Sequence, residues 1–227
     1  MKKQKKFSEI CIIGMGRYGQ SVANNLLKKS ANISLILIDK DEKNLLSYKN
    51  EVSKIYVADA ADPKVLKSLG IIESDAVVVA TGDNVEIVAS LQEIGVKNII
   101  SRANSERHAR VLKQIGVSQI ISPEQEAGIK TAIIVANQSF LRYSQDLEDI
   151  GEEFVIGTCY IKNAEIFDKQ IRDLDLRKRN TNIVLIQRQN TSFLPDGNFR
   201  IQKDDLITAI AKVEDLNSVF DWFSEYE

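Results

Sequence analysis

The sequence predicts an α/β protein with a doubly wound, Rossmann-like parallel sheet and a second, smaller α+β domain. The first observation behind this prediction is the motif Gly14-x-Gly16-x-x-Gly19, which directly follows the apolar residues 10–13. The second is a repeated pattern in which a helical stretch ends in glycine and an apolar run follows. This pattern occurs at Gly70, Gly95 and Gly116. With 227 residues, of which 44% are hydrophobic, the chain has room for one large or two small domains, and we expect two.

The glycine motif predicts a nucleotide-binding loop. Gly14 allows the tight turn, Gly16 lets the backbone approach a pyrophosphate, and Gly19 lets the next helix pack on the strand. That helix offers its unpaired N-terminal amides to the phosphates. The predicted site includes the other residues of the motif, which are Met15, Arg17 and Tyr18.

Asp39 follows Gly19 by 20 residues and ends the apolar run at residues 33–38. A carboxylate in this place accepts hydrogen bonds from a ribose and repels a 2′-phosphate, which favours NAD, ATP or ADP over NADP. Lys40 beside it belongs to the same predicted site. The alternative is that Asp39 serves only to cap a helix that we expect to begin at Asp41.

The other elements of the first domain follow in chain order. We expect parallel strands at residues 10–13, 33–38, 54–57, 76–80, 98–101 and 119–121. We expect helices at residues 21–29, 41–49, 63–69 and 85–94, with Asp62 as the N-cap of the third. A further helix begins at Ser122-Pro123-Glu124-Gln125 and is expected to run to about Phe140. Six parallel strands complete a doubly wound sheet.

Two loops at the carboxyl edge of this sheet extend the predicted site. Asp59 and Ala60 follow the third strand, where the adenine edge is expected, and Thr81 and Gly82 follow the fourth strand at the mouth of the crevice. Ordinary loop chemistry explains each pair equally well.

Arg17 lies between the second and third glycines and is predicted to reach over the phosphates. A guanidinium there binds a terminal phosphate bidentately, which matters more for ATP than for the internal pyrophosphate of NAD. The alternative, a solvated arginine in the first helical turn, is slightly unfavourable against the helix dipole.

The second domain is expected to be a small α+β module. We predict strands at residues 154–161, 182–187 and 206–211, helices at residues 167–179 and 213–223, and a turn at residues 193–197. Residues 146–153 are acidic and show no clear period, so we place the boundary there, with domains at residues 1–145 and 154–227. So short a module has a small core, and we expect it to pair with a second copy.

Composition excludes several classes of function. The chain has 30 basic and 32 acidic residues, and a net charge of -2 draws it neither to nucleic acid nor to an anionic membrane. No run approaches the 18 apolar residues that a membrane helix requires. Cys11 and Cys159 lie far apart in apolar runs and are predicted to be buried free thiols, which indicates a reducing cytoplasm.

The nucleotide loop has no evident catalyst near it. His108 is the one histidine and has polar neighbours on a predicted helix, which favours a surface face. No tyrosine is followed four residues later by lysine, and no Gly-x-x-x-x-Gly-Lys-Ser/Thr motif is present. The sequence therefore predicts a nucleotide-binding site that does not catalyse a reaction. A nicotinamide-dependent oxidoreductase remains the alternative, because His108 could face the crevice.

The sequence resembles the regulatory subunits of Ktr/Trk potassium uptake systems, which are built on the RCK (or KTN) domain. The resemblance depends on the glycine motif, Ile38-Asp39, Asp59-Ala60, the strand end at Thr81, and Ile121-Ser122-Pro123-Glu124. It covers nearly the whole chain, and it implies a non-catalytic subunit that senses ATP, ADP or NAD(H). It also implies a ring of eight subunits, built from dimers, docked on the cytoplasmic side of a potassium-translocating membrane protein.

The resemblance assigns two residues of the first domain. Arg17 is implied to contact the terminal phosphate of ATP, and Glu124 to lie near the nucleotide at a subunit interface, where it helps to hold a cation. The plain alternative for Glu124 is an acid favoured in the first turn of a helix. In relatives that bind cyclic di-AMP in the second domain, asparagine often replaces the residue at Asp175, whose carboxylate opposes a phosphate. Arg177 is a candidate to compensate.

Overall fold

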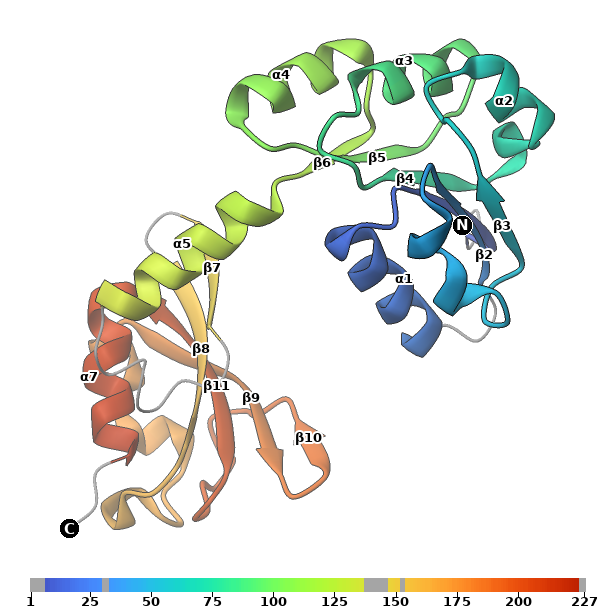
Figure 1. Ribbon diagram of the computed structural model, residues 1–227. Coiled ribbons are helices and arrows are strands. Elements are labelled where there is room, and N and C mark those ends of the chain that lie inside the picture. Colours follow the sequence, from blue (N-terminus) through green and yellow to red (C-terminus); the bar gives the residue numbers. More distant parts are fainter. Residues whose placement is uncertain (1–6, 30–32, 137–146, 152–153, 225–227) are drawn as a thin grey trace, which may run out of the picture. The chain divides into compact units, whose positions relative to one another are not determined.

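A computed structural model describes residues 7–29, 33–136, 147–151 and 154–224 (Figure 1). It consists of two compact units, Met1–Gln125 and Glu126–Glu227. The division falls inside helix α5 (Pro123–Ala136), which begins in the first unit and continues into the second. The predicted boundary at residues 146–153 stays a prediction. Residues 137–140, the expected end of this helix, lie outside the described residues, as do the N-terminal lysines.

The first unit contains a six-stranded sheet in the order β3-β2-β1-β4-β5-β6, and every pair of neighbours is parallel. Its strands are β1 (Glu9–Ile13), β2 (Ser34–Asp39), β3 (Lys54–Val57), β4 (Ala76–Val79), β5 (Ile99–Arg102) and β6 (Gln119–Ile121). The predicted doubly wound parallel sheet is confirmed. The direction of growth along the sheet reverses between β1 and β4, and this reversal is where such folds bind ligands.

Helices cover both faces of this sheet, because alternate residues of the central strands are apolar on both sides (Figure 1). Ile12 and Leu37 pack on the face that carries α1 (Arg17–Lys29). Cys11 and Ile38 pack on the opposite face. That face carries α2 (Pro63–Ser68), α3 (Val85–Glu93) and α4 (Glu106–Ile115). The glycines of the repeated pattern all have left-handed backbone, with φ of 71° to 98°, so they end their helical stretches as predicted.

The prediction of a helix at residues 41–49 is wrong. The segment forms two 3-10 turns, η1 (Glu42–Asn44) and η2 (Leu46–Tyr48), besides a turn between them. The buried side chains Leu45 and Tyr48 are three residues apart, which fits the three-residue period of a 3-10 turn.

The second unit is a five-stranded antiparallel sheet in the order β10-β9-β11-β8-β7. Its strands are β7 (Leu147–Gly151), β8 (Phe154–Tyr160), β9 (Thr181–Arg188), β10 (Thr191–Phe193) and β11 (Leu206–Lys212), and α7 (Val213–Ser224) closes the chain. Phe220 and Phe223 of α7 are fully buried in its core, and Ile133 and Ile134 of α5 pack against that core. The predicted α+β module is confirmed.

One expectation for this unit is wrong. Residues 167–179 were predicted as one helix, but they contain the 3-10 turns η5 (Ile171–Leu174) and η6 (Leu176–Arg179), preceded by η4 (Ala164–Ile166). Asp175 between them has a left-handed backbone with φ of 52°, which ends a helix. Part of the acidic segment in which the boundary was placed forms β7, an edge strand that pairs with β8, where charged residues are common.

None of the helices in the described residues combines the length and apolar character needed to cross a bilayer.

Candidate functional site

A cavity of about 310 Å³ lies at the carboxyl ends of β1, β2 and β4, beside the point where the strand order reverses. Its walls are Ile13, Gly14, Ile38, Asp39, Lys40, Ala58, Ala60, Thr81, Asp83 and Ile87. The structure therefore brings five of the predicted site residues to one cavity. They are Gly14, Asp39, Lys40, Ala60 and Thr81.

Each glycine of the motif meets a different constraint. Gly14 has φ of +91°, and a Cβ on it would lie 2.3 Å from Thr81 Cγ2. A Cβ on Gly19 would lie 1.9 Å from the carbonyl oxygen of Gly14, so this position requires glycine for the helix to pack. A Cβ on Gly16 would meet no atom within 4 Å. Open space beside Gly16, next to the first turn of α1, fits a phosphate group.

Asp39 combines a structural role with a place in the cavity wall. Its Oδ2 accepts a 2.6 Å hydrogen bond from the backbone N–H of Met15 in the glycine loop. Its Oδ1 accepts from the backbone N–H of Asp41 at 2.8 Å and from Asn44 Nδ2 at 3.2 Å. These two bonds hold the turn after β2. The N-cap of η1 is Asp41 itself, whose Oδ1 accepts from the backbone N–H of Lys43 at 3.0 Å, so Asp39 is not the helix cap of the alternative. Because each carboxylate oxygen has two lone pairs, Oδ2 still fits a ribose hydroxyl.

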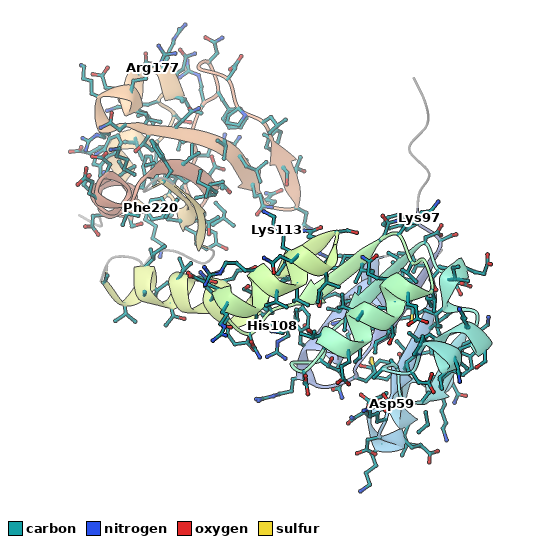
Figure 2. The ribbon with its side chains drawn as sticks, turned by 90° about the horizontal axis from the view of Figure 1, so that it is seen from above. Asp59, Lys97, His108, Lys113, Arg177 and Phe220 are labelled. Carbon is teal, nitrogen blue, oxygen red and sulfur yellow. The ribbon has the colours of Figure 1, made fainter. Side chains whose placement is uncertain are left out.

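Lys40 and Asp59 form an ion pair at the rim of the cavity, with 3.1 Å between Nζ and Oδ2. Asp59, labelled in Figure 2, does not line the cavity itself. Its Oδ1 accepts from the backbone N–H of Ala61 at 2.9 Å, and this bond, followed by Lys40, lowers the pKa of Asp59. The pair places a cation and an acceptor where the adenine edge was predicted.

The other predicted residues do not line the cavity. Arg17 is the first residue of α1 and is exposed, and Tyr18 follows it. The carbonyl oxygen of Gly82 accepts from Asn104 Nδ2 at 3.4 Å. Glu124 lies in the first turn of α5, and its Oε1 is hydrogen-bonded to Arg102 Nη2. Its own backbone N–H, and less strongly Arg102, lower the pKa of Glu124.

Sequence reasoning missed three residues of this region. Asp83 lines the cavity from the loop after β4, and its signal is the polar run that begins at Thr81. Gln20 Nε2 donates to the carbonyl oxygen of Met15 at 3.0 Å, so side chains hold both sides of this loop residue. Arg102 ends β5 as Asp39 ends β2, and that placement is the signal that would have found it.

His108 is half-buried, not fully on the surface, and it does not line the cavity. Figure 2 labels it on α4. Its Nε2 lies 3.0 Å from Asn84 Oδ1, and its Nδ1 lies 2.9 Å from Asn104 Oδ1. Asn84 Nδ2 donates to the carbonyl oxygens of Thr81 and Arg102, at 2.8 Å each. His108 thus supports the loop that carries Thr81.

The cysteines are buried free thiols, as predicted, and burial raises the pKa of both. Across the described residues, no group of three or more His, Cys, Asp and Glu side chains is placed to hold a metal ion. The predicted role of Glu124 at a cation stays a prediction.

The second unit has its own cavity of about 580 Å³, which η5, η6 and β9 help to form. Its walls are Ile171, Arg172, Asp175, Leu176, Arg177, Thr181, Asn182, Ile183, Pro195, Asp196 and Gly197. Arg177 is labelled in Figure 2. The Asp175 carboxylate pairs with Lys178 Nζ at 2.6 Å, which offsets its charge.

The first unit has the architecture of Rossmann-type nucleotide-binding domains, with a glycine loop and a strand-end carboxylate at the switch point. Two family models match the chain, the TrkA-N domain over residues 10–123 and the TrkA-C domain over residues 161–224. The chain belongs to the TrkA-N family, which confirms the membership that the sequence predicted.

Similar proteins cover nearly the whole chain. The chain is 31% identical over 225 residues to the protein named "Uncharacterized protein MG323" of Mycoplasma genitalium, and the alignment covers 96% of each chain. It is 29% identical over 215 residues to Ktr system potassium uptake protein C of Bacillus subtilis, covering 92% of this chain and 94% of that protein.

Among solved structures, the GsuK channel bound to NAD aligns with a TM-score of 0.59 at 15% identity, over 97% of this chain and 40% of the GsuK chain. GsuK bound to ADP aligns with a TM-score of 0.50 at 16% identity, over 59% and 36% of the two chains. The chain thus spans less than half the length of these GsuK chains. At this identity the likeness shows a shared fold.

Proposed function

We propose that this chain is the nucleotide-binding regulatory subunit of a potassium uptake system. The observation that carries the proposal is the succession of TrkA-N and TrkA-C matches, together with a likeness to Ktr system potassium uptake protein C over 92% of the chain. The open space beside Gly16 and the carboxylate of Asp39 support nucleotide binding by these residues.

The chemistry of the cavity favours binding without catalysis. Its charged wall residues are Asp39, Lys40 and Asp83. Asp39 already holds the glycine loop, and Lys40 is paired with Asp59. His108, on which an oxidoreductase would depend for a proton donor, braces a loop outside the cavity wall. We therefore propose a non-enzymatic role.

ATP, ADP and NAD(H) are the proposed nucleotides, and two of the similar GsuK structures are bound to NAD and to ADP. When a nucleotide is bound, Asp39 would hold the ribose and the loop at Gly16 the phosphates. Such a ligand changes a conformational equilibrium only by the difference between its affinities for the two states. ATP and ADP differ by one phosphate near Arg17, and this is the difference the proposal requires.

The proposed partner is a potassium-translocating membrane protein, with this chain on its cytoplasmic side as a ring of eight copies. What supports this assembly is the resemblance to the regulatory subunits of Ktr/Trk systems, which implies such a ring. A ring of this size has a mass of about 200 kDa for a 25.5 kDa chain, which solution measurements separate easily from a monomer.

Cyclic di-AMP is a proposed second ligand, in the cavity of the second unit. Arg172 and Arg177 offer guanidinium groups to two phosphates, and Lys178 offsets the charge of Asp175. The carboxylate of Asp175 therefore opposes the phosphates of cyclic di-AMP less than the sequence suggested.

Thermal unfolding of the full-length protein with ATP, ADP, NAD, NADH and cyclic di-AMP tests these proposals. A ligand at 100 times its dissociation constant should stabilise the protein by about 2.7 kcal/mol. Asp39→Asn should lose much of the shift with adenine nucleotides, because its amide replaces one of the two acceptor oxygens by a donor that faces the N–H of either Met15 or Asp41. The control Asp41→Asn, in the same exposed turn, should keep the shift.

For cyclic di-AMP, Arg177→Ala should lose the shift, while Lys169→Ala, exposed and outside the cavity wall, should keep it. A protein that runs as a monomer and is stabilised by no adenine nucleotide would contradict the regulatory function.

A further inference from the structure

Arg102 lies on the side of the glycine loop opposite to Asp39. In the strand order β3-β2-β1-β4-β5-β6, Asp39 ends β2, whereas Arg102 ends β5, beyond β4. All these strands are parallel, so both residues lie at the carboxyl edge of the sheet. A nucleotide with its ribose at Asp39 and its first phosphates on the glycine loop therefore extends toward Arg102.

The guanidinium of Arg102 is held but not saturated. Its Nη2 pairs with Glu124 Oε1, and its Cζ lies 6.0 Å from the centre of the Tyr18 ring, in the first turn of α1. Its Nε is buried and has no hydrogen-bond partner within the part of the chain that the structure describes. A buried N–H donor without an acceptor is costly, so the site has an unmet need for an anionic or carbonyl oxygen.

We propose that Arg102 binds the terminal phosphate of the nucleotide and that Glu124 competes with this phosphate for the same guanidinium. The proposal rests on the proposed nucleotide-binding function of the crevice. It adds Arg102 to Arg17 as a second residue that distinguishes longer from shorter phosphate chains. Nε is buried while Glu124 holds the guanidinium, so the proposal requires the guanidinium to turn away from Glu124. A phosphate then engages Nε and an Nη group together.

The exchange is energetically accessible because the pair it breaks is partly solvated. The side chains of Arg102 and Glu124 are 24% and 60% exposed, and ion pairs of this kind contribute little to stability. A phosphate that takes Arg102 leaves Glu124 without its partner. Since Glu124 lies in the first turn of α5, the helix that continues into the second unit, the exchange gives that helix a nucleotide-dependent contact.

Calorimetric binding of ATP, ADP and AMP to the full-length protein tests the proposal. Arg102→Ala should weaken the affinity for ATP by about tenfold and leave the affinity for AMP nearly unchanged, because AMP lacks the distal phosphates. Arg102→Lys, which keeps the charge but lacks the Nε donor, should lower the affinity for ATP less than Arg102→Ala does. Glu124→Gln should raise the affinity for ATP by about threefold, since it removes the competing carboxylate. Glu124→Gln should have no effect in the Arg102→Ala background.

The control is Arg110→Ala, which removes the same charge from an exposed position on α4 and should leave all three affinities unchanged. Failure of all three nucleotides, and of NAD and NADH, to bind the unaltered protein would refute the proposed function itself. Failure of ATP, ADP and AMP alone would overturn the role of Arg102. If they bind but Arg102→Ala leaves the ratio of ATP to AMP affinity unchanged, the role of Arg102 is overturned. Should Arg102→Ala prove unstable, the Arg102→Lys and Glu124→Gln affinities decide the matter in the same way.

Discussion

At the scale of single residues, the side chains around the crevice also hold its loops in place. Asp39 accepts a hydrogen bond from the backbone N–H of Met15, and Gln20 donates one to the carbonyl oxygen of Met15. The peptide groups on both sides of this loop residue are therefore held in place. Asn84, 1% exposed, joins Thr81 in the loop after β4 to Arg102 at the end of β5. A substitution at such a residue changes both binding and loop geometry, so each test requires a matched control.

The first residue-scale prediction concerns the Asp59 carboxyl. Its pKa lies below the ordinary value of 3.8, chiefly because of the Ala61 N–H and secondarily because of Lys40. Its contribution to folding stability is therefore complete above that value and is lost as pH falls through the lower folded value. Lys40→Met should raise the pKa only partway, as measured by NMR titration of the carboxyl carbon. A return to the ordinary value would show that the Ala61 bond has no effect.

The second concerns Asp205, which is fully buried and paired bidentately with Arg188, at 2.7 and 2.8 Å. It also accepts the N–H of Gln202 at 2.8 Å. Asp205→Ala leaves a half-buried guanidinium unpaired and should destabilise the protein by about 3–5 kcal/mol in urea unfolding. The exposed control Asp173→Ala should stay within about 0.5 kcal/mol. Equal effects would contradict the importance of burial.

At the scale of elements, different glycines of the loop serve folding and binding. Packing requires glycine at position 19, whereas Gly16 leaves open space beside the first turn of α1. Sequence spacing alone identified both positions, because the turn and the strand–helix contact impose the same motif wherever they occur.

Gly19→Ala and Gly16→Ala should therefore differ. The Cβ of the first would lie 1.9 Å from the carbonyl oxygen of Gly14, and the variant should lose about 1–3 kcal/mol of stability or more. The Cβ of the second meets no atom within 4 Å, so its unfolding transition should match the unaltered protein while its ADP affinity falls. Thermal unfolding without ligand, followed by ADP titration, checks both. Normal ADP affinity in Gly16→Ala would contradict the phosphate site.

Helices were overpredicted where buried residues are few and polar residues many. Residues 41–49 and 167–179 contain helix-forming residues, but 3-10 turns satisfy their few buried contacts. At Asp175 and Asn180 the left-handed backbone, with φ of 52° and 45°, interrupts any longer helix. Propensity is too weak a signal over so few turns to outweigh these tertiary constraints.

At the scale of the whole molecule, two units with separate cores share the helix α5. The sequence has one tryptophan, Trp222, and it lies in the second unit, stacked on Phe223 with 5.2 Å between ring centres. The Cζ of Arg179 lies 4.5 Å from the Trp222 ring. Trp222 fluorescence therefore reports on the second unit alone.

ATP should raise the midpoint of the helical circular-dichroism transition more than that of the Trp222 fluorescence transition. The reason is that a ligand stabilises most directly the unit that binds it. Cyclic di-AMP should act in the opposite order, because its proposed cavity lies in the second unit. Identical shifts of both signals with both ligands would contradict separate sites and indicate a single cooperative transition.

The sequence by itself determined the doubly wound sheet, the glycine loop, Asp39 and the family, because strand periodicity and glycine spacing are local consequences of backbone geometry. Only the tertiary structure decided that Asp39 holds Met15, that His108 braces a loop, and that Arg102 ends β5 beside Tyr18 and Glu124. These contacts join residues from different strands and helices. Sequence spacing does not specify which loops meet, since that depends on the order in which the strands pack.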